Sequence, residues 1–155
     1  MNRLNVYLIS IFGTELVGFI AGVLTREGTR IYAETVAKPE LSPPAVVFPI
    51  VWTVLYALMG IGAARIYLAP KCSARTFALQ LYAAQLFLNF AWSFIFFTAQ
   101  AYTLAFLWLL ALAMLVDMMF LQFLKLDRWA AVIQFPYQGW LLFAAYLSFV
   151  VMIRN

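Results

Sequence analysis

Five long apolar segments dominate this sequence of 155 residues. Each has roughly the 20 residues that an α-helix needs to cross the hydrocarbon core of a bilayer. They lack the alternation of apolar and polar residues that a membrane β-barrel requires. The segments therefore predict an all-α integral membrane protein, a bundle of five transmembrane helices forming a single domain over residues 1–155. The expected spans are residues 4–25, 45–68, 76–98, 101–124 and 129–153, with a long first loop over residues 26–44.

The composition excludes several other classes of protein. Hydrophobic residues make up 66% of the chain and charged residues 10%, whereas soluble domains are about 45–50% apolar and about 25% charged. The single Cys72 cannot form an internal disulfide, and the absence of histidine removes the commonest metal ligand and general base. We therefore expect no metal site. The net charge of +4 lies at the ends of the apolar segments, which favours membrane lipids over nucleic acid as partners.

Three of the expected helices carry a face on which aromatic and polar residues recur at helical spacing. These faces consist of Trp52 and Tyr56 on the second helix, Gln85, Asn89, Trp92 and Phe96 on the third, and Tyr137, Trp140, Ala144 and Ser148 on the fifth. Polar side chains in a bilayer turn away from lipid. The faces either form contacts between helices or line a pocket for a flat aromatic ligand. Both interpretations remain open from the residues alone.

Two carboxyl groups, Glu15 and Asp117, fall inside expected spans. Each costs about 2.5–3.5 kcal/mol at a helix centre, so each is a candidate functional residue. The alternatives are a mutual pair, a protonated carboxyl or a position near the membrane surface. Because Glu15 interrupts the first apolar segment and no clear cleavage site follows it, we expect a transmembrane helix there rather than a signal peptide.

Small residues predict close helix contacts. Gly18 and Gly22 form a GxxxG motif in the first segment, and Gly60 with Ala64 forms a similar pair in the second. Such motifs serve packing within a bundle as well as dimerisation.

Four stretches in order resemble one known family. They are residues 38–44 (KPELSPP), 48–60 (FPIVWTVLYALMG), 85–93 (QLFLNFAWS) and 136–140 (PYQGW). These stretches resemble the loop and the second, third and fifth helices of the tryptophan-rich sensory protein and translocator protein family (TspO/MBR, the peripheral-type benzodiazepine receptors).

The resemblance implies a five-helix bundle, usually a homodimer, with a ligand pocket beneath the first loop. Family members bind porphyrins such as protoporphyrin IX, cholesterol-like lipids, and synthetic isoquinoline and benzodiazepine ligands. The implied function is a membrane receptor or sensor that regulates porphyrin metabolism. The alternatives are a light- and oxygen-dependent porphyrin-degrading enzyme, in which Trp52 and Trp140 match the tryptophans held responsible, and a carrier that transports lipid or porphyrin. The implied location is a bacterial membrane, or the mitochondrial outer membrane in a eukaryote.

The resemblance and the three faces together predict a ligand-binding set. It consists of Tyr32, Lys38, Pro44, Trp52, Tyr56, Gln85, Asn89, Trp92, Tyr137, Trp140, Ala144 and Ser148. Tyr32 and Lys38 are expected to meet the propionates of a porphyrin near the loop. We expect no obligatory cofactor, and protoporphyrin IX or heme as ligand. Without histidine, iron ligation would fall to Tyr, Met or Cys, so a metal-free porphyrin fits better.

The chain also departs from the family pattern. Ile31 and Leu41 stand in the loop where tryptophan is usual, and Ser148 stands where asparagine is expected. Fewer loop aromatics leave less area over a flat ligand, so we expect reduced porphyrin affinity. The family's tyrosine in its cholesterol motif appears here as Phe149, which leaves cholesterol recognition with little support.

Overall fold

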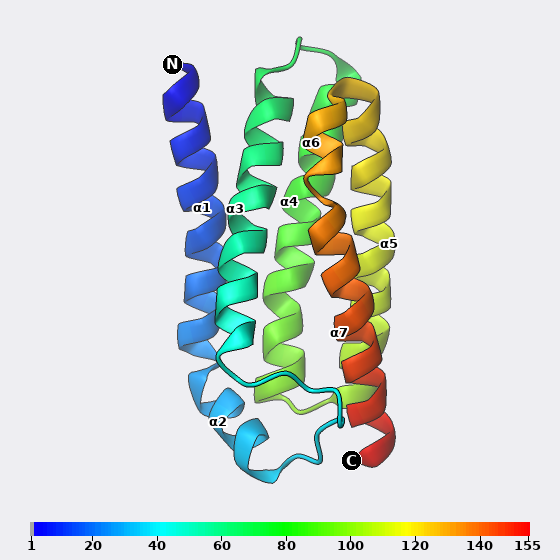
Figure 1. The fold of residues 1–155 in the computed structure, drawn as a ribbon. Coiled ribbons are helices and arrows are strands. Elements are labelled where there is room, and N and C mark those ends of the chain that lie inside the picture. Colours follow the sequence, from blue (N-terminus) through cyan, green and yellow to red (C-terminus); the bar gives the residue numbers. More distant parts are fainter. Residues whose placement is uncertain (1) are drawn as a thin grey trace.

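The computed structural model describes residues 2–155, which form helices and connections without any strand. Figure 1 shows long helices lying side by side, with the short α2 beneath one end of the bundle. The elements are α1 (Arg3–Leu24), α2 (Arg26–Thr35), α3 (Val47–Leu68), α4 (Ser73–Ser93), the π-helical turn η1 (Phe94–Thr98), α5 (Tyr102–Leu126), α6 (Arg128–Val132) and α7 (Phe135–Arg154).

Five helical units are long and apolar enough to cross a membrane. They run over Arg3–Leu24, Val47–Leu68, Ser73–Thr98, Tyr102–Leu126 and Arg128–Arg154. Their ends lie within three residues of the spans expected from the sequence. Large hydrophobic side chains such as Phe12, Leu16 and Leu142 point outward from the bundle, as expected for a surface that meets lipid. The five-helix membrane bundle predicted from the sequence is confirmed.

The first connection is not a simple loop, because α2 occupies its first half. Arg30 lies three residues after Glu27 and four before Glu34, and pairs with both along the exposed side of α2; such spacing stabilises a helix. On the opposite side, Gly28 touches the backbone of Phe97, whose carbonyl oxygen would lie 2.3 Å from an added Cβ. Glycine thus lets α2 dock on η1. The rest of the connection crosses the end of the bundle toward α7 before it returns to α3 (Figure 1).

The fifth span is broken near its start. Asp127 caps the short α6 by accepting a hydrogen bond from the Ala130 N–H, and the chain turns at Ile133 and Gln134 before α7 begins. Pro136 occupies the first turn of α7, where its missing N–H removes no helical hydrogen bond. The break allows α6 to lie against α3 while α7 follows α5.

Small residues bring α1 and α3 close together. A Cβ on Gly60 would lie 2.7 Å from the Ile11 Cα, and the Ser10 hydroxyl donates to the Gly60 carbonyl at 2.8 Å. Gly18 faces the Tyr56 ring, whereas a Cβ on Gly22 would meet no atom of the described chain within 4 Å. The GxxxG motif of α1 therefore uses its first glycine inside the bundle and exposes its second.

Candidate functional site

Side chains from α3, α4 and α7 form a hydrogen-bonded chain in the centre of the bundle. The Tyr56 hydroxyl donates to Asn89 Oδ1 at 2.7 Å, and Asn89 Nδ2 donates to the Tyr137 hydroxyl at 3.0 Å. The Tyr137 hydroxyl in turn donates to Gln85 Oε1 at 2.9 Å. All four residues are buried. The polar faces expected from the sequence do turn inward, and their amides find partners on other helices.

Two tryptophans flank this buried chain in the space between α3 and α7. The Trp52 ring lies 5.4 Å from the Tyr56 ring and 6.3 Å from the Tyr137 ring, measured between centroids. Trp140 meets Phe48 of α3 edge to face at 5.8 Å. Both tryptophans are only half-buried, so each has one side against the core and another still accessible. Aromatic rings therefore line both helices where they face each other.

A second aromatic cluster lies where α2 docks on η1. The Tyr32 ring lies 5.3 Å from Phe96, and Trp92 stacks on Phe96 at 4.9 Å. The Trp92 indole N–H donates to the Ala105 carbonyl of α5 at 3.1 Å, and Lys38 Nζ donates to the Ala33 carbonyl at 2.6 Å. Tyr32, Lys38 and Trp92 thus gather in this cluster, apart from the hydrogen-bonded chain. Trp92 also packs against the central core and links the two.

The remaining predicted residues differ in their placement. Ser148 is buried, and its hydroxyl has no hydrogen-bond partner among residues 2–155. Ala144 packs against the central core. Pro44 is exposed at the turn before α3, where its carbonyl accepts from the Val47 N–H, and it belongs to neither aromatic cluster. Its assignment to the binding set has no geometric support in this structure.

Comparison with known proteins identifies the family. The sequence profile described as the TspO/MBR family matches residues 10–154. This chain belongs to the TspO/MBR family. Together with the five apolar helices, membership makes it a multi-pass integral membrane protein.

The relatives come from distant organisms. The tryptophan-rich protein TspO of Chlorobaculum tepidum is 31% identical over 140 residues, covering 90% of this chain and 89% of that protein. The tryptophan-rich sensory protein of Cereibacter sphaeroides is 36% identical over 118 residues, covering 76% and 73%. The translocator protein of Ovis aries is 35% identical over 135 residues, covering 85% and 79%. The resemblance inferred from four short motifs thus extends over nearly the whole chain.

The first connection of this TspO/MBR protein is tied to the end of α7. Asn155 receives a hydrogen bond from the Ala37 N–H at 3.1 Å and donates to the Ala37 carbonyl at 3.2 Å. Arg154 donates to the Lys38 carbonyl at 3.2 Å. Sequence reasoning missed both residues, because a polar end after an apolar helix carries no sign of what it will touch.

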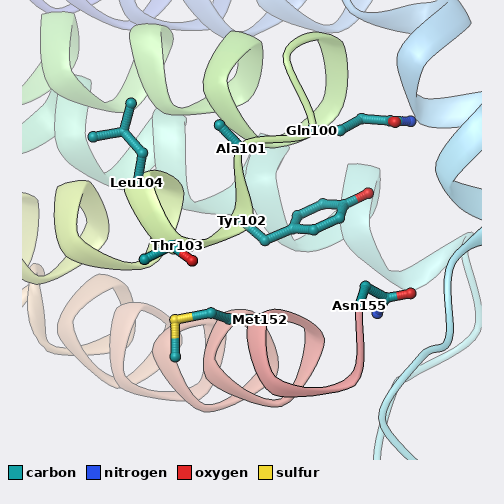
Figure 2. Close-up of a pocket in the computed structure, with 7 residues that line it drawn as sticks. All are labelled: Gln100, Ala101, Tyr102, Thr103, Leu104, Met152 and Asn155. Atoms are coloured by element: carbon teal, nitrogen blue, oxygen red, sulfur yellow. The ribbon is translucent and has the colours of Figure 1, made fainter.

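A hollow of about 400 Å³ lies close to these bonds, between the start of α5 and the end of α7, and Figure 2 shows the residues that line it. Gln100, Tyr102 and Asn155 extend toward one side of the hollow, and Leu104 and Met152 lie toward the other. The Tyr102 hydroxyl is buried and has no partner within the described part of the chain. This polar hollow adjoins the second aromatic cluster, because Tyr102 packs edge to face on Phe96 at 5.3 Å.

The acidic residues of the TspO/MBR bundle have separate partners. Asp117 is exposed and accepts a hydrogen bond from Gln138 at 2.7 Å, so the mutual pair with Glu15 that the sequence left open does not form. Asp127 follows the C-terminal end of α5, and its Oδ2 lies 2.8 Å from Arg65. Burial alone would raise the pKa of Asp127, but the hydrogen bonds from Ala130 and Arg65 outweigh it and lower the pKa. No group of three or more Cys, His, Asp or Glu side chains within residues 2–155 is placed to hold a metal ion.

Proposed function

We propose that this protein is a membrane receptor that binds a tetrapyrrole such as protoporphyrin IX between α3, α4 and α7. The proposal rests mainly on one observation. Hydrogen-bonding groups of three helices converge at Tyr56, Asn89 and Tyr137, and the half-buried rings of Trp52 and Trp140 lie beside them. A flat aromatic ligand gains stacking area from such rings and orientation from a few polar groups. The relatives named sensory and translocator proteins are consistent with this role.

Binding in this place requires a rearrangement of side chains. The Trp52 ring rests on Tyr56 and Tyr137, and Trp140 meets Phe48, so a macrocycle has to replace contacts between rings with contacts of its own. Only molecules whose rings have already moved apart can bind, so the apparent affinity equals the intrinsic affinity multiplied by the fraction of such molecules. The reduced affinity expected from Ile31 and Leu41 in the loop acts in the same direction.

The second aromatic cluster supplies a place for the ligand's carboxylates. Lys38 Nζ lies 5.9 Å from the centre of the Tyr32 ring and is exposed. Exchange of its bond to the Ala33 carbonyl for a bond to a propionate would replace a hydrogen bond to a neutral acceptor with an ion pair. Isoquinoline and benzodiazepine compounds, which are also flat and aromatic, would compete for the same rings. The proposal includes a homodimer in a bacterial membrane as the setting.

A titration in the dark tests this proposal. Purified protein in detergent is titrated with protoporphyrin IX while tryptophan fluorescence and the Soret band are followed. Wild type is compared with Trp140→Phe and Asn89→Ala, and with Trp129→Phe as a control, because Trp129 is 66% exposed on α6 away from the proposed site. We expect saturable binding that both site variants weaken by roughly tenfold, the effect of about 1.4 kcal/mol, and that the control leaves unchanged. Binding that none of the variants alters would refute the proposed location.

A second candidate function is light-driven oxidation of the bound porphyrin with dioxygen. One observation favours Trp52 over Trp140 as the oxidisable side chain, because Trp52 lies against two phenol rings whereas Trp140 lies against Phe48 and Phe143. An oxidised Trp52 can take one electron from Tyr56 or Tyr137, which leaves a tyrosyl radical that a reductant from solution then has to reduce. Illumination of the saturated samples distinguishes the two functions. An enzyme loses porphyrin turnover in Trp52→Phe with binding retained, whereas a receptor shows the same slow bleaching in both proteins.

A further inference from the structure

A lipid-facing hollow between α5 and α7 contains a charged group that the proposed tetrapyrrole site does not use. The hollow has a volume of about 390 Å³, and its lining includes Asp117, Phe135, Gln138, Gly139 and Leu142. Asp117 is exposed and precedes the end of α5 by roughly 13 Å of helix at a rise of about 1.5 Å per residue. A carboxylate at that depth faces hydrocarbon rather than water, which is costly unless a partner compensates it.

Asp117 and Gln138 share one hydrogen bond in the hollow and leave acceptor atoms without a donor. Gln138 Nε2 donates to Asp117 Oδ1 at 2.7 Å, and no other group among residues 2–155 donates to Asp117. Gln138 Oε1 is buried and has no partner within the same residues. The unsatisfied atoms of both side chains are acceptors, so the missing partner is a donor. Because one of the acceptors is a carboxylate, a positively charged donor satisfies the hollow best.

We propose that this hollow binds a membrane-soluble primary amine, with its ammonium group on Asp117 and its hydrocarbon chain along Phe135 and Leu142. A primary ammonium carries three N–H donors and a positive charge. The donors can satisfy both the Asp117 carboxylate and Gln138 Oε1, and the charge complements that of the carboxylate. A long-chain alcohol offers one donor and no charge, and a fatty acid offers a negative charge that Asp117 repels. The volume lies within the range of small-molecule pockets, about 300–1,000 Å³.

A second copy of the chain fits the hollow less well than an amine does. A symmetric dimer buries the same patch of both partners, so an interface centred on the hollow would bring a second Asp117 close to the first. Two carboxylates that share one apolar site disfavour each other's charged form. The charge of the hollow therefore points to a cationic ligand rather than to another copy of itself.

Gly139 offers a way to block the hollow without disturbing the bundle. A Cβ added there would meet no atom of residues 2–155 within 4 Å, so a leucine can extend into the hollow. Gly13 on α1 is equally open, and Gly13→Leu is the matched control on another lipid-facing surface. Asp117→Asn keeps the size of the side chain and its bond to Gln138 but removes the charge.

The experiment uses photoreactive diazirine derivatives of a long-chain primary amine, the matching alcohol and the matching fatty acid. Each is added to the full-length protein in phosphatidylcholine nanodiscs, illuminated, and the labelled residues are mapped by mass spectrometry. We expect the amine to label residues around Asp117 and Gln138 most strongly and the acid least. Asp117→Asn should lower amine labelling by roughly tenfold, the size of a lost charge-assisted hydrogen bond, and leave alcohol labelling unchanged. Gly139→Leu should abolish both, and Gly13→Leu neither.

Three results would overturn the proposal. The first is equal labelling by amine, alcohol and acid, which would mean that the probes only sample lipid-facing surface. The second is amine labelling that survives Gly139→Leu. The third is protection of the hollow from all three probes together with crosslinks between two copies of the chain, which would assign the hollow to a dimer contact. The tetrapyrrole titration reports on a different part of the bundle, so its failure would leave this result intact.

Discussion

Single residues decide how closely the helices of this bundle approach one another. Gly60 is the clearest case, because the α1 backbone occupies the space that any side chain at this position would need. Gly22 belongs to the GxxxG motif of α1, yet a Cβ added there would meet no atom of residues 2–155 within 4 Å. Both glycines belong to small-residue motifs in the sequence, but only Gly60 lies at a contact between helices.

We therefore predict opposite effects of alanine at these two positions. Gly60→Ala forces α1 and α3 apart and should destabilise the protein by about 1–3 kcal/mol, the usual cost of overpacking. Gly22→Ala should leave stability unchanged or raise it by up to about 1 kcal/mol, because alanine favours a helix. Thermal unfolding in detergent, followed by circular dichroism, measures both. Equal unfolding temperatures for the two variants would contradict the packing described here.

A second prediction concerns the hydroxyl of Tyr137, which links Asn89 to Gln85. Tyr137→Phe keeps the ring but leaves two buried amide groups without this partner, which costs about 1–3 kcal/mol. Tyr146→Phe is the matched control, because Tyr146 is exposed on the same helix and should change stability little. The same thermal unfolding assay compares them. If both variants unfold like wild type, the hydrogen-bonded chain does not stabilise the bundle.

At the scale of elements, the junction of α5 and α6 depends on one carboxylate. Asp127 caps α6 and pairs with Arg65 at the end of α3, so it joins three helices at the end of the bundle opposite α2. The polar residues between apolar segments thus do more than connect them. Asp127, for example, fixes the start of α6 beside the end of α3.

This pairing predicts a pH dependence of stability. The pKa of Asp127 is lower in the folded protein than in the unfolded chain, where it is about 3.9. Its stabilising contribution is therefore fully present above about pH 4 and is lost as the pH falls through the lower folded pKa. Asp127→Asn retains a capping side chain but should make the decrease in stability at acidic pH smaller. Unfolding temperatures measured from about pH 6 down to about pH 3 provide the test, with Glu40→Gln as control, because the Glu40 side chain is 91% exposed and lies 3.9 Å from Arg154. An unchanged acid profile in Asp127→Asn would argue against the pair.

Over the whole molecule, the last residue of α7, Arg154, and its C-cap, Asn155, bind the first connection. The Asn155 side chain forms two hydrogen bonds with the Ala37 backbone across 118 positions of sequence. The connection covers the end of the bundle that contains the second aromatic cluster (Figure 1). The same connection contains Tyr32 and Lys38, so the bonds to Asn155 help to position both residues.

We predict that Asn155→Ala frees this connection. Hydrogen–deuterium exchange of the amides at residues 36–42 should accelerate by about tenfold, since the Ala37 N–H loses its acceptor and local opening becomes easier by about 1.4 kcal/mol. Asn5→Ala is the control, because Asn5 is exposed on α1 at the other end of the bundle. Exchange in α5 should remain as in wild type. Unchanged exchange at Ala37 would mean that the Asn155 side chain does not restrain the connection.

The class of the molecule and the residues that share helix faces follow from the sequence without the structure. Apolar segments longer than a bilayer core leave helices as the favoured spanning structure, and helical spacing places Gln85 with Asn89 and Trp52 with Tyr56 on shared faces. Which faces meet became visible only in the folded bundle. It joined Tyr56, Asn89 and Tyr137, placed Tyr32 in a second cluster that Trp92 connects to the core, and paired Asp117 with Gln138 instead of Glu15. Spacing along a helix specifies the side on which a residue lies, but its partner depends on rotations and crossings of whole helices, which packing over the entire bundle sets.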